Sequence, residues 1–184
     1  MPLTISTSTT PATGPTLDSP TTLAQLAQAQ GSAAPAGSTV VGLTVPVIRS
    51  DQTALQYQTR NHNSEFLFNT GTLRLSLRQE IHLSDALSQC AQEVWSTHER
   101  KHVRDNEQII ARMDAQLRAD AQFAAILVNP TVWRPTSQFQ ATQQLIQARV
   151  GAVFMQLTQA AVQALDTQQE YANTEAEVTR RCNP

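Results

Sequence analysis

The segment HERKHVRDNEQ, residues 98–108, contains the side chains of this sequence that are best placed to do chemistry. His98 and His102 are four residues apart, so on a helix their imidazoles face the same side, one turn from each other. Two imidazoles in that arrangement suit two ligands of a tetrahedral zinc ion. Glu99 would project beside such an ion, where its carboxylate can take a proton from water and pass it to a leaving amine.

The helix that carries these residues is predicted to have an apolar stripe at the helical period. The stripe contains Leu87, Ala91, Val94, Trp95, Ile109 and Met113. His98, His102 and Asp105 lie in the middle of it. Polar groups on a core face are unfavourable unless they satisfy one another or bind something. This phase favours a binding site over a solvated charged segment in which the histidines pack beside carboxylates.

Two long helices are predicted to position the site. The first begins after Ser84, a good N-cap residue, and runs to about Ile126. The segment VNPTVWRPTS, with its two prolines, ends it, and a second helix follows from about Gln138 to Arg181. If the two form an antiparallel hairpin, facing residues have numbers that sum to about 265.

A zinc site needs a third protein ligand. Cys90 and Cys182 sum to 272, which is within a turn or two of that value, and in this register His98 lies opposite residue 174 and His102 opposite residue 170. Glu175 falls on the inner stripe of the second helix in this region. Glu175 is therefore the predicted third ligand, while Asp105 and Glu177 remain alternatives, Asp105 also as a partner that orients a histidine. Tyr171 lies on the same stripe and could donate its hydroxyl to an oxyanion or simply close the core.

Cys90 and Cys182 fit the same register within one or two helical turns. Two cysteines are too few for a disulfide framework and lack the short spacing of a CxxC pair. They could face each other near the open end of the hairpin and cross-link it in an oxidising compartment.

The N-terminal part of the chain differs in composition from the rest. Residues 1–37 are rich in Ser, Thr, Pro and Ala and are predicted to be a disordered leader, with residues 38–184 forming the folded domain. Strand patterns begin at residue 38. EFLF and TLRLSLRQEIHL are predicted to form a hairpin around the turn NTG, with Leu73, Leu75, Leu77, Gln79 and Ile81 on one face. The predicted fold is α+β: a small antiparallel sheet followed by a long antiparallel two-helix hairpin.

Composition argues against several classes of partner. Thirteen basic and fifteen acidic residues give a net charge of −2, which disfavours binding to nucleic acid or to an anionic membrane surface. No apolar run approaches the roughly 18 residues of a membrane span. The N-terminus lacks the pattern of a Sec signal peptide, so we expect secretion or delivery by a dedicated apparatus that reads the leader, with a cytoplasmic location still open.

HERKH at 98–102 resembles the HExxH motif of the zincin metalloproteases. The resemblance implies His98 and His102 as zinc ligands, Glu99 as the general base, and a protein or peptide as the substrate. The metzincin continuation is absent, since position 105 is Asp and position 108 is Gln. A glutamate ligand on a later helix is similar to the gluzincin arrangement, although NTEAE at 173–177 resembles the gluzincin signature NExxxD only loosely.

The order of strands, motif helix and second helix is also similar to a group of bacterial secreted or periplasmic zinc proteases, with EYANTEAEV in place of their YDxxTxHG-like segment. The sequence therefore predicts a zinc metallopeptidase. The alternatives are a non-enzymatic helical-hairpin interaction or structural protein of a secretion or delivery system, and a metal-binding protein without hydrolase activity.

Overall fold

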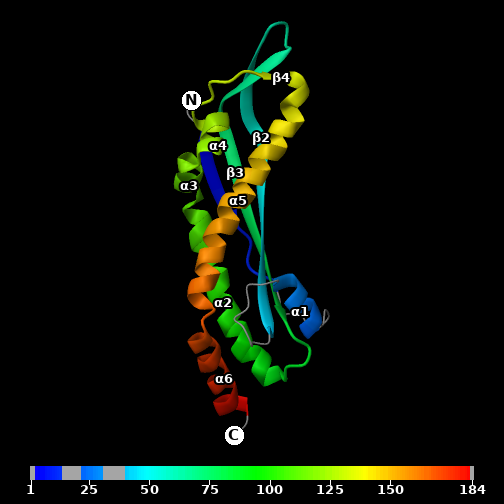
Figure 1. Ribbon diagram of the computed structural model, residues 1–184, viewed down its shortest axis with the longest axis vertical. Coiled ribbons are helices and arrows are strands. Elements are labelled where there is room, and N and C mark those ends of the chain that lie inside the picture. Colours follow the sequence, from blue (N-terminus) through cyan, green and yellow to red (C-terminus); the bar gives the residue numbers. More distant parts are fainter. Residues whose placement is uncertain (1–2, 14–21, 31–39, 183–184) are drawn as a thin grey trace. The chain divides into compact units, whose positions relative to one another are not determined.

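The structure is a computed structural model that describes residues 3–13, 22–30 and 40–182. These residues form an α+β fold whose strands make one mixed sheet, in the order β1-β3-β2, with β4 paired to β3 (Figure 1). The strands are β1 (Thr4–Thr9), β2 (Gly42–Arg60), β3 (Glu65–Leu83) and β4 (Arg134–Pro135). The helices are α1 (Leu23–Gln30), α2 (Gln89–Ala111), α3 (Met113–Ala119), α4 (Ala121–Phe123), α5 (Phe139–Leu165) and α6 (Gln168–Cys182), with a π-turn η2 (Ala124–Val128) and a 3-10 turn η3 (Thr136–Gln138).

This architecture corrects the predicted fold class. The predicted small antiparallel sheet is instead a mixed sheet, because β1 pairs with β3 in parallel, from Thr4 opposite Thr72 to Thr9 opposite Leu77. The predicted two-helix hairpin is instead divided among five α-helices of the described residues, α2 to α6. Two parts of the predicted disordered leader are ordered as β1 and α1. Residues 1–2, 14–21 and 31–37 of that leader lie outside the described residues.

The chain divides into two compact units that interleave along the sequence. Unit 1 contains residues 1–10, 48–77 and 107–157, and unit 2 contains residues 11–47, 78–106 and 158–184. The long elements β2, β3, α2 and α5 contribute residues to both units. The domain boundary predicted at residue 37 stays a prediction.

Strand β3 confirms the predicted alternation. Leu73, Leu75, Leu77, Gln79 and Ile81 are all buried. Arg74, Ser76 and Arg78, the residues between the first four of them, are exposed. Because side chains alternate between the two faces of a strand, this pattern places one face of β3 in the core.

The turn of the β2–β3 hairpin lies elsewhere than predicted. β3 runs without interruption through NTG, and the chain reverses at residues 61–64. Asn61, His62 and Asn63 there have φ of 51°, 56° and 64°, a left-handed conformation that Asn adopts more readily than most residues. Gly71 has φ 124° and lies so close to the backbone of Ala54 and Leu55 that a side chain would clash. Gly71 of the NTG segment therefore allows the two strands to approach each other closely and does not form the turn.

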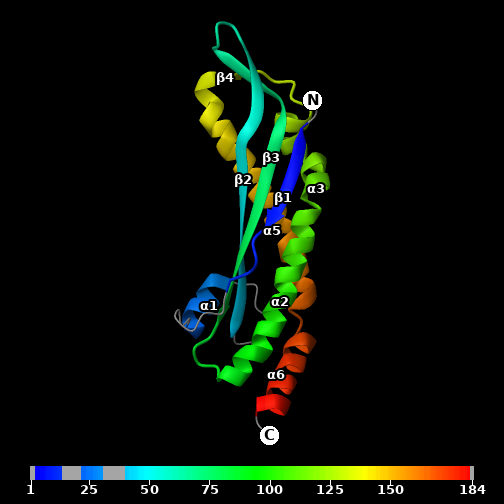
Figure 2. The same cartoon turned by 180° about the vertical axis from the view of Figure 1, so that it is seen from behind.

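In unit 1 the sheet packs against α3, α4, η2 and the first part of α5 (Figure 2). The sheet contributes Leu55, Phe66, Phe68, Leu73, Leu75 and Leu77 to the core. The helical segments contribute Met113, Leu117, Phe123, Ile126, Leu127, Ile146, Val150 and Phe154. Arg118 donates to the carbonyl oxygen of Leu3 at 2.7 Å, which holds the start of β1 beside α3. This hydrogen bond and the backbone pairing with β3 hold β1 in place, although β1 has few apolar residues.

In unit 2, α6 lies alongside the first half of α2 (Figures 1 and 2). A smaller core of Ile81, Leu83, Trp95 and Val103 lies between β3 and α2, and Tyr171 and Val178 of α6 pack against it. A disulfide joins Cys90 to Cys182 and so links the beginning of α2 to the end of α6. The predicted pairing of the two cysteines is confirmed.

Both predicted long helices are interrupted. α2 begins at Gln89, after Ser88, whose hydroxyl accepts from the Ala91 N–H at 3.3 Å, and not after Ser84. It ends at Ala111, where the N–H of Arg112 bonds to the carbonyl of Ile109. The second predicted helix is divided into α5 and α6 by a break at residues 166 and 167. Among the described residues, no helix is both long enough and apolar enough to cross a membrane.

One ion pair of unit 1 is expected to make the free energy of unfolding decrease at acid pH. Asp120 caps α4 by accepting from the Phe123 N–H at 2.8 Å, and it pairs with Arg149. The Arg149 guanidinium lowers the pKa of the Asp120 carboxyl. A lowered folded-state pKa stabilises the fold above the unfolded pKa of about 3.9, and this stabilisation is lost as pH falls through the folded value. Asp120→Asn is therefore expected to lower the free energy of unfolding by about 1 kcal/mol at pH 7 and to match the wild type near pH 2.

Chemical denaturation across this pH range would measure the difference. Asp114→Asn is the control, because Asp114 forms a more exposed pair with Arg118. A deficit of Asp120→Asn that persists unchanged at pH 2 would contradict the assignment.

Candidate metal centre

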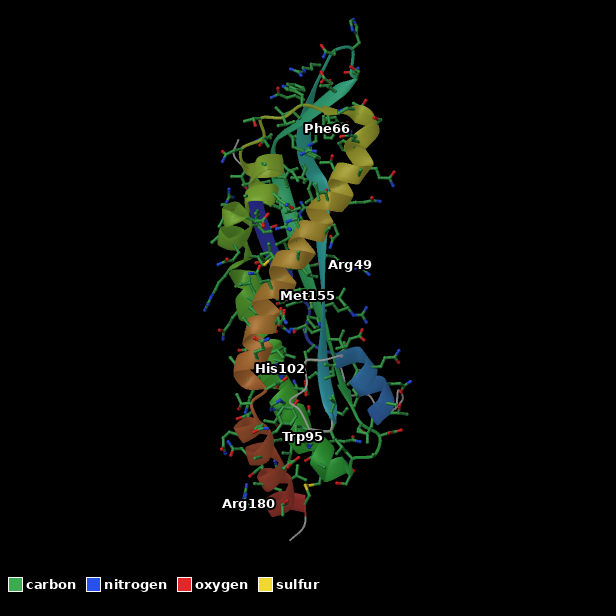
Figure 3. All side chains as sticks on the ribbon, in the orientation of Figure 1. Arg49, Phe66, Trp95, His102, Met155 and Arg180 are labelled. Atoms are coloured by element: carbon green, nitrogen blue, oxygen red, sulfur yellow. A yellow bond between two sulfur atoms is a disulfide. The ribbon has the colours of Figure 1, made fainter. Side chains whose placement is uncertain are left out.

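Helix α2 holds both histidines of the motif in the core of unit 2, as their predicted phase requires. His98 is 2% exposed and His102 is 7% exposed. Figure 3 labels Trp95 and His102 on this part of α2. The Trp95 ring lies one turn before His98, with its centroid 5.7 Å from that imidazole, and the two imidazole centroids are 5.3 Å apart. Aromatic packing thus fixes the position of His98.

Asp166 is the carboxylate that meets the two histidines. Its Oδ1 lies 3.0 Å from Nε2 of His102 and 3.3 Å from Nε2 of His98, and the three atoms all lie within 4.8 Å of one another. The Asp166 side chain is only 7% exposed. Asp166, and not the predicted third ligand Glu175, is therefore the carboxylate next to the two histidines.

The break between α5 and α6 presents Asp166 to the histidines. Thr167 caps α6, because its hydroxyl oxygen accepts from the N–H of Glu170 at 3.1 Å. Asp166 is the residue before this cap and therefore lies outside the regular turns of both helices. The sequence contains the signal for the break, since Thr167-Gln-Gln-Glu170 follows the S/T-x-x-E pattern of a helix start. This signal was missed because residues 138–181 were predicted to form one continuous helix.

The three atoms fit the donor set and spacing of a zinc site. Ligand atoms bound to one tetrahedral zinc at about 2.0–2.1 Å lie about 3.3 Å from one another. The two distances to Asp166 Oδ1, 3.0 and 3.3 Å, match this spacing. Hydrogen bonds from the two imidazoles to the Asp166 carboxylate would give similar distances, so the donor set of two imidazoles and one carboxylate is what points to zinc. The residues present therefore fit a zinc ion.

The electrostatics of the cluster favour a cation between its members. Burial alone would raise the pKa of Asp166, but hydrogen bonds and the positive potential of His102 and His98 lower it to about 2. Burial alone would lower the pKa of His102, but the hydrogen bond and charge of Asp166 raise it. The ionised form of Asp166 and the protonated form of His102 are thus both stabilised, so the cluster favours positive charge between its members.

Glu99 is buried on the neighbouring face of α2, against the start of β2. It is 4% exposed, and its Oε2 accepts from the Thr44 hydroxyl at 2.8 Å. A Cβ added to Gly42 would lie 2.7 Å from Oε1 of Glu99, so glycine leaves the room that the carboxylate occupies. Burial raises the pKa of the Glu99 carboxyl, although the two histidines act to lower it. A carboxylate in this environment is well suited to accept a proton.

The remaining predicted residues lie as follows. Tyr171 is half-buried, with its ring centroid 5.6 Å from that of His98, so the structure brings it to the site. Glu175 is exposed and stands outside the cluster. Glu177 pairs with Arg180 on the surface of α6. Asp105 is half-buried and outside the cluster, and its charge contributes to the raised pKa of His102.

No protein-family model, curated protein or solved structure matches this chain.

Proposed function

We propose that this protein is a zinc-dependent metallopeptidase in which His98, His102 and Asp166 hold the ion and Glu99 is the general base. The observation that carries the proposal is the convergence of the two Nε2 atoms on Asp166 Oδ1, beside a buried glutamate on the same helix. Two histidines and a carboxylate are a usual protein ligand set of catalytic zinc.

The chain's own residues supply the proton transfers. When bound, zinc lowers the pKa of water and polarises the substrate carbonyl. Glu99 takes the proton of the attacking water and delivers it to the nitrogen of the leaving amine. Thr44 orients the Glu99 carboxylate through its hydrogen bond to Oε2. In this proposal Tyr171, whose ring lies next to that of His98, donates its hydroxyl to the oxygen that becomes negative in the transition state.

The setting we propose is secretion or delivery out of the producing cell, with a protein or peptide as the substrate. The Cys90–Cys182 disulfide supports this setting, because disulfides persist mainly in oxidising compartments. Recognition of the N-terminal segment by a delivery apparatus is part of the same proposal.

The burial of all three ligands favours a second candidate, a structural zinc that holds the break between α5 and α6 against α2. Structural zinc sites are closed by protein ligands, whereas catalytic sites keep one position open. The two candidates share the ligands and differ in the role of Glu99.

Glu99→Gln separates the two candidates. Glutamine keeps the shape of the side chain but accepts no proton, so we expect zinc content equal to that of the wild type and cleavage slower by about 100-fold or more. The assay is digestion of a mixture of unstructured peptides by the full chain, with products identified by mass spectrometry.

Cleavage by Glu99→Gln at the wild-type rate would refute the role of Glu99. Stoichiometric zinc in a wild-type protein that cleaves none of the peptides would support the structural candidate.

A further inference from the structure

One buried atom of the site has no role in the arrangement described so far. Nδ1 of His98 is buried and has no hydrogen-bond partner among the described residues, while Nε2 of the same ring faces Asp166. A buried polar atom without a partner is unfavourable. The geometry therefore points to a group that can reach Nδ1.

Glu170 is that group. Its Oε1 lies 3.7 Å from Nδ1 of His98. A hydrogen bond needs about 2.7–3.2 Å, so a movement of less than about 1 Å closes the gap. The first turn of α6 restricts where Glu170 can go, because its N–H is held by the Thr167 hydroxyl. Asp166 and Glu170 thus approach the two nitrogens of one imidazole from the same turn of the chain.

Lys101 holds the Glu170 carboxylate in this position. Its Nζ donates to Oε1 of Glu170, the same oxygen that faces His98. Lys101 follows His98 by three residues on α2, so the two side chains lie on neighbouring positions of the helix surface. The pair is partly solvated, since the Lys101 side chain is 38% exposed and that of Glu170 is 23% exposed.

We propose that Glu170 is a positioning residue for the metal ligand His98, an inference that rests on the zinc site proposed above. A neutral imidazole carries one proton. When the Glu170 carboxylate accepts that proton's hydrogen bond at Nδ1, Nε2 is left unprotonated and free to bind zinc. Lys101 keeps the carboxylate beside the ring, and the ligand orientation is set before the ion arrives.

A comparison of zinc affinity tests this role. Competition with a chromogenic chelator would give the zinc dissociation constants of the full-length wild type, Glu170→Ala, Lys101→Gln and Glu175→Ala. We expect Glu170→Ala to bind zinc about 10–100-fold more weakly, the usual effect of losing a carboxylate that orients a histidine ligand. Lys101→Gln should weaken zinc binding less than Glu170→Ala does, because Glu170 loses the lysine that holds it but can still reach Nδ1. Glu175→Ala is the matched control on the exposed face of α6.

The same variants exclude a merely structural role. If the Lys101–Glu170 pair only joined α2 to α6, its two truncations would change zinc affinity equally. Glu170→Gln serves as a milder variant should Glu170→Ala fold poorly, since its amide oxygen still accepts from Nδ1–H, and we expect an intermediate affinity. Nitrogen-15 NMR of the zinc-loaded wild type should place the proton of His98 on Nδ1.

Two results would overturn the inference, and they are distinguishable. Wild-type affinity in both Glu170 variants, with the wild type itself binding zinc, would remove the role of Glu170 and leave the zinc site standing. Failure of the wild type to bind zinc would overturn the proposed function together with this inference.

Discussion

Replacing Asp166 by asparagine is expected to weaken zinc binding by about 100–1000-fold, whereas replacing Glu175 by glutamine should leave it unchanged. Structural zinc sites bind with about 10–16 kcal/mol, so one ligand of several accounts for roughly 3–4 kcal/mol. Since about 1.4 kcal/mol corresponds to a factor of ten, this loss is two to three orders of magnitude. Asp166 Oδ1 lies within 3.3 Å of both histidine Nε2 atoms, while Glu175 is exposed.

The two variants are matched, because each converts one carboxylate to an amide. Chelator competition measures the zinc dissociation constant of each. The asparagine variant should also keep the break before α6, since Thr167 still caps that helix. If Glu175→Gln lost zinc and Asp166→Asn retained it, the ligand assignment from geometry would be wrong and the one from helical register would be restored.

Removing the disulfide is the second change with a large expected effect. Cys90 and Cys182 are separated by 92 residues, so the cross-link closes a long loop in the unfolded chain. The loop-entropy relation gives a stabilisation of about 4–5 kcal/mol for a loop of that size. The double variant Cys90→Ser and Cys182→Ser should therefore lose about this amount in the free energy of unfolding.

Denaturant titration of oxidised wild type, reduced wild type and the double variant would measure the loss. The reduced wild type is the control, because it lacks the cross-link but keeps both side chains. The reduced protein and the double variant should agree with each other. A loss below about 1 kcal/mol in both would show that α6 is held to α2 by packing alone, and that the link contributes little.

The sequence predicted those features that depend on periodicity. The alternation of β3 follows from leucines at every second position, and burial of His98 and His102 follows from their phase among the apolar residues of α2. The hairpin register was less accurate, since the sequence placed residues 170–175 opposite the two histidines, whereas Asp166 contacts them. Periodicity is a local property, which explains why it can be read from one chain.

The features that were missed depend on tertiary contacts or on helix ends. TISTST has little apolar surface, and it is a strand because its backbone pairs with the edge of β3. Such pairing uses main-chain groups, so it produces only a weak pattern in the amino-acid sequence. Asp166 was missed because residues 138–181 were predicted to be one helix, and the phase calculated across the break at residues 166 and 167 placed Glu175 on the inner stripe.

Metal analysis of the protein tests the central claim most directly. Wild-type full-length protein, purified without chelators or added metal, should contain one zinc ion per chain by mass spectrometry, and His98→Ala prepared in parallel should contain none. Folded wild-type protein with no stoichiometric metal would contradict the account, because the convergence of His98, His102 and Asp166 would then be a hydrogen-bonded cluster without an ion.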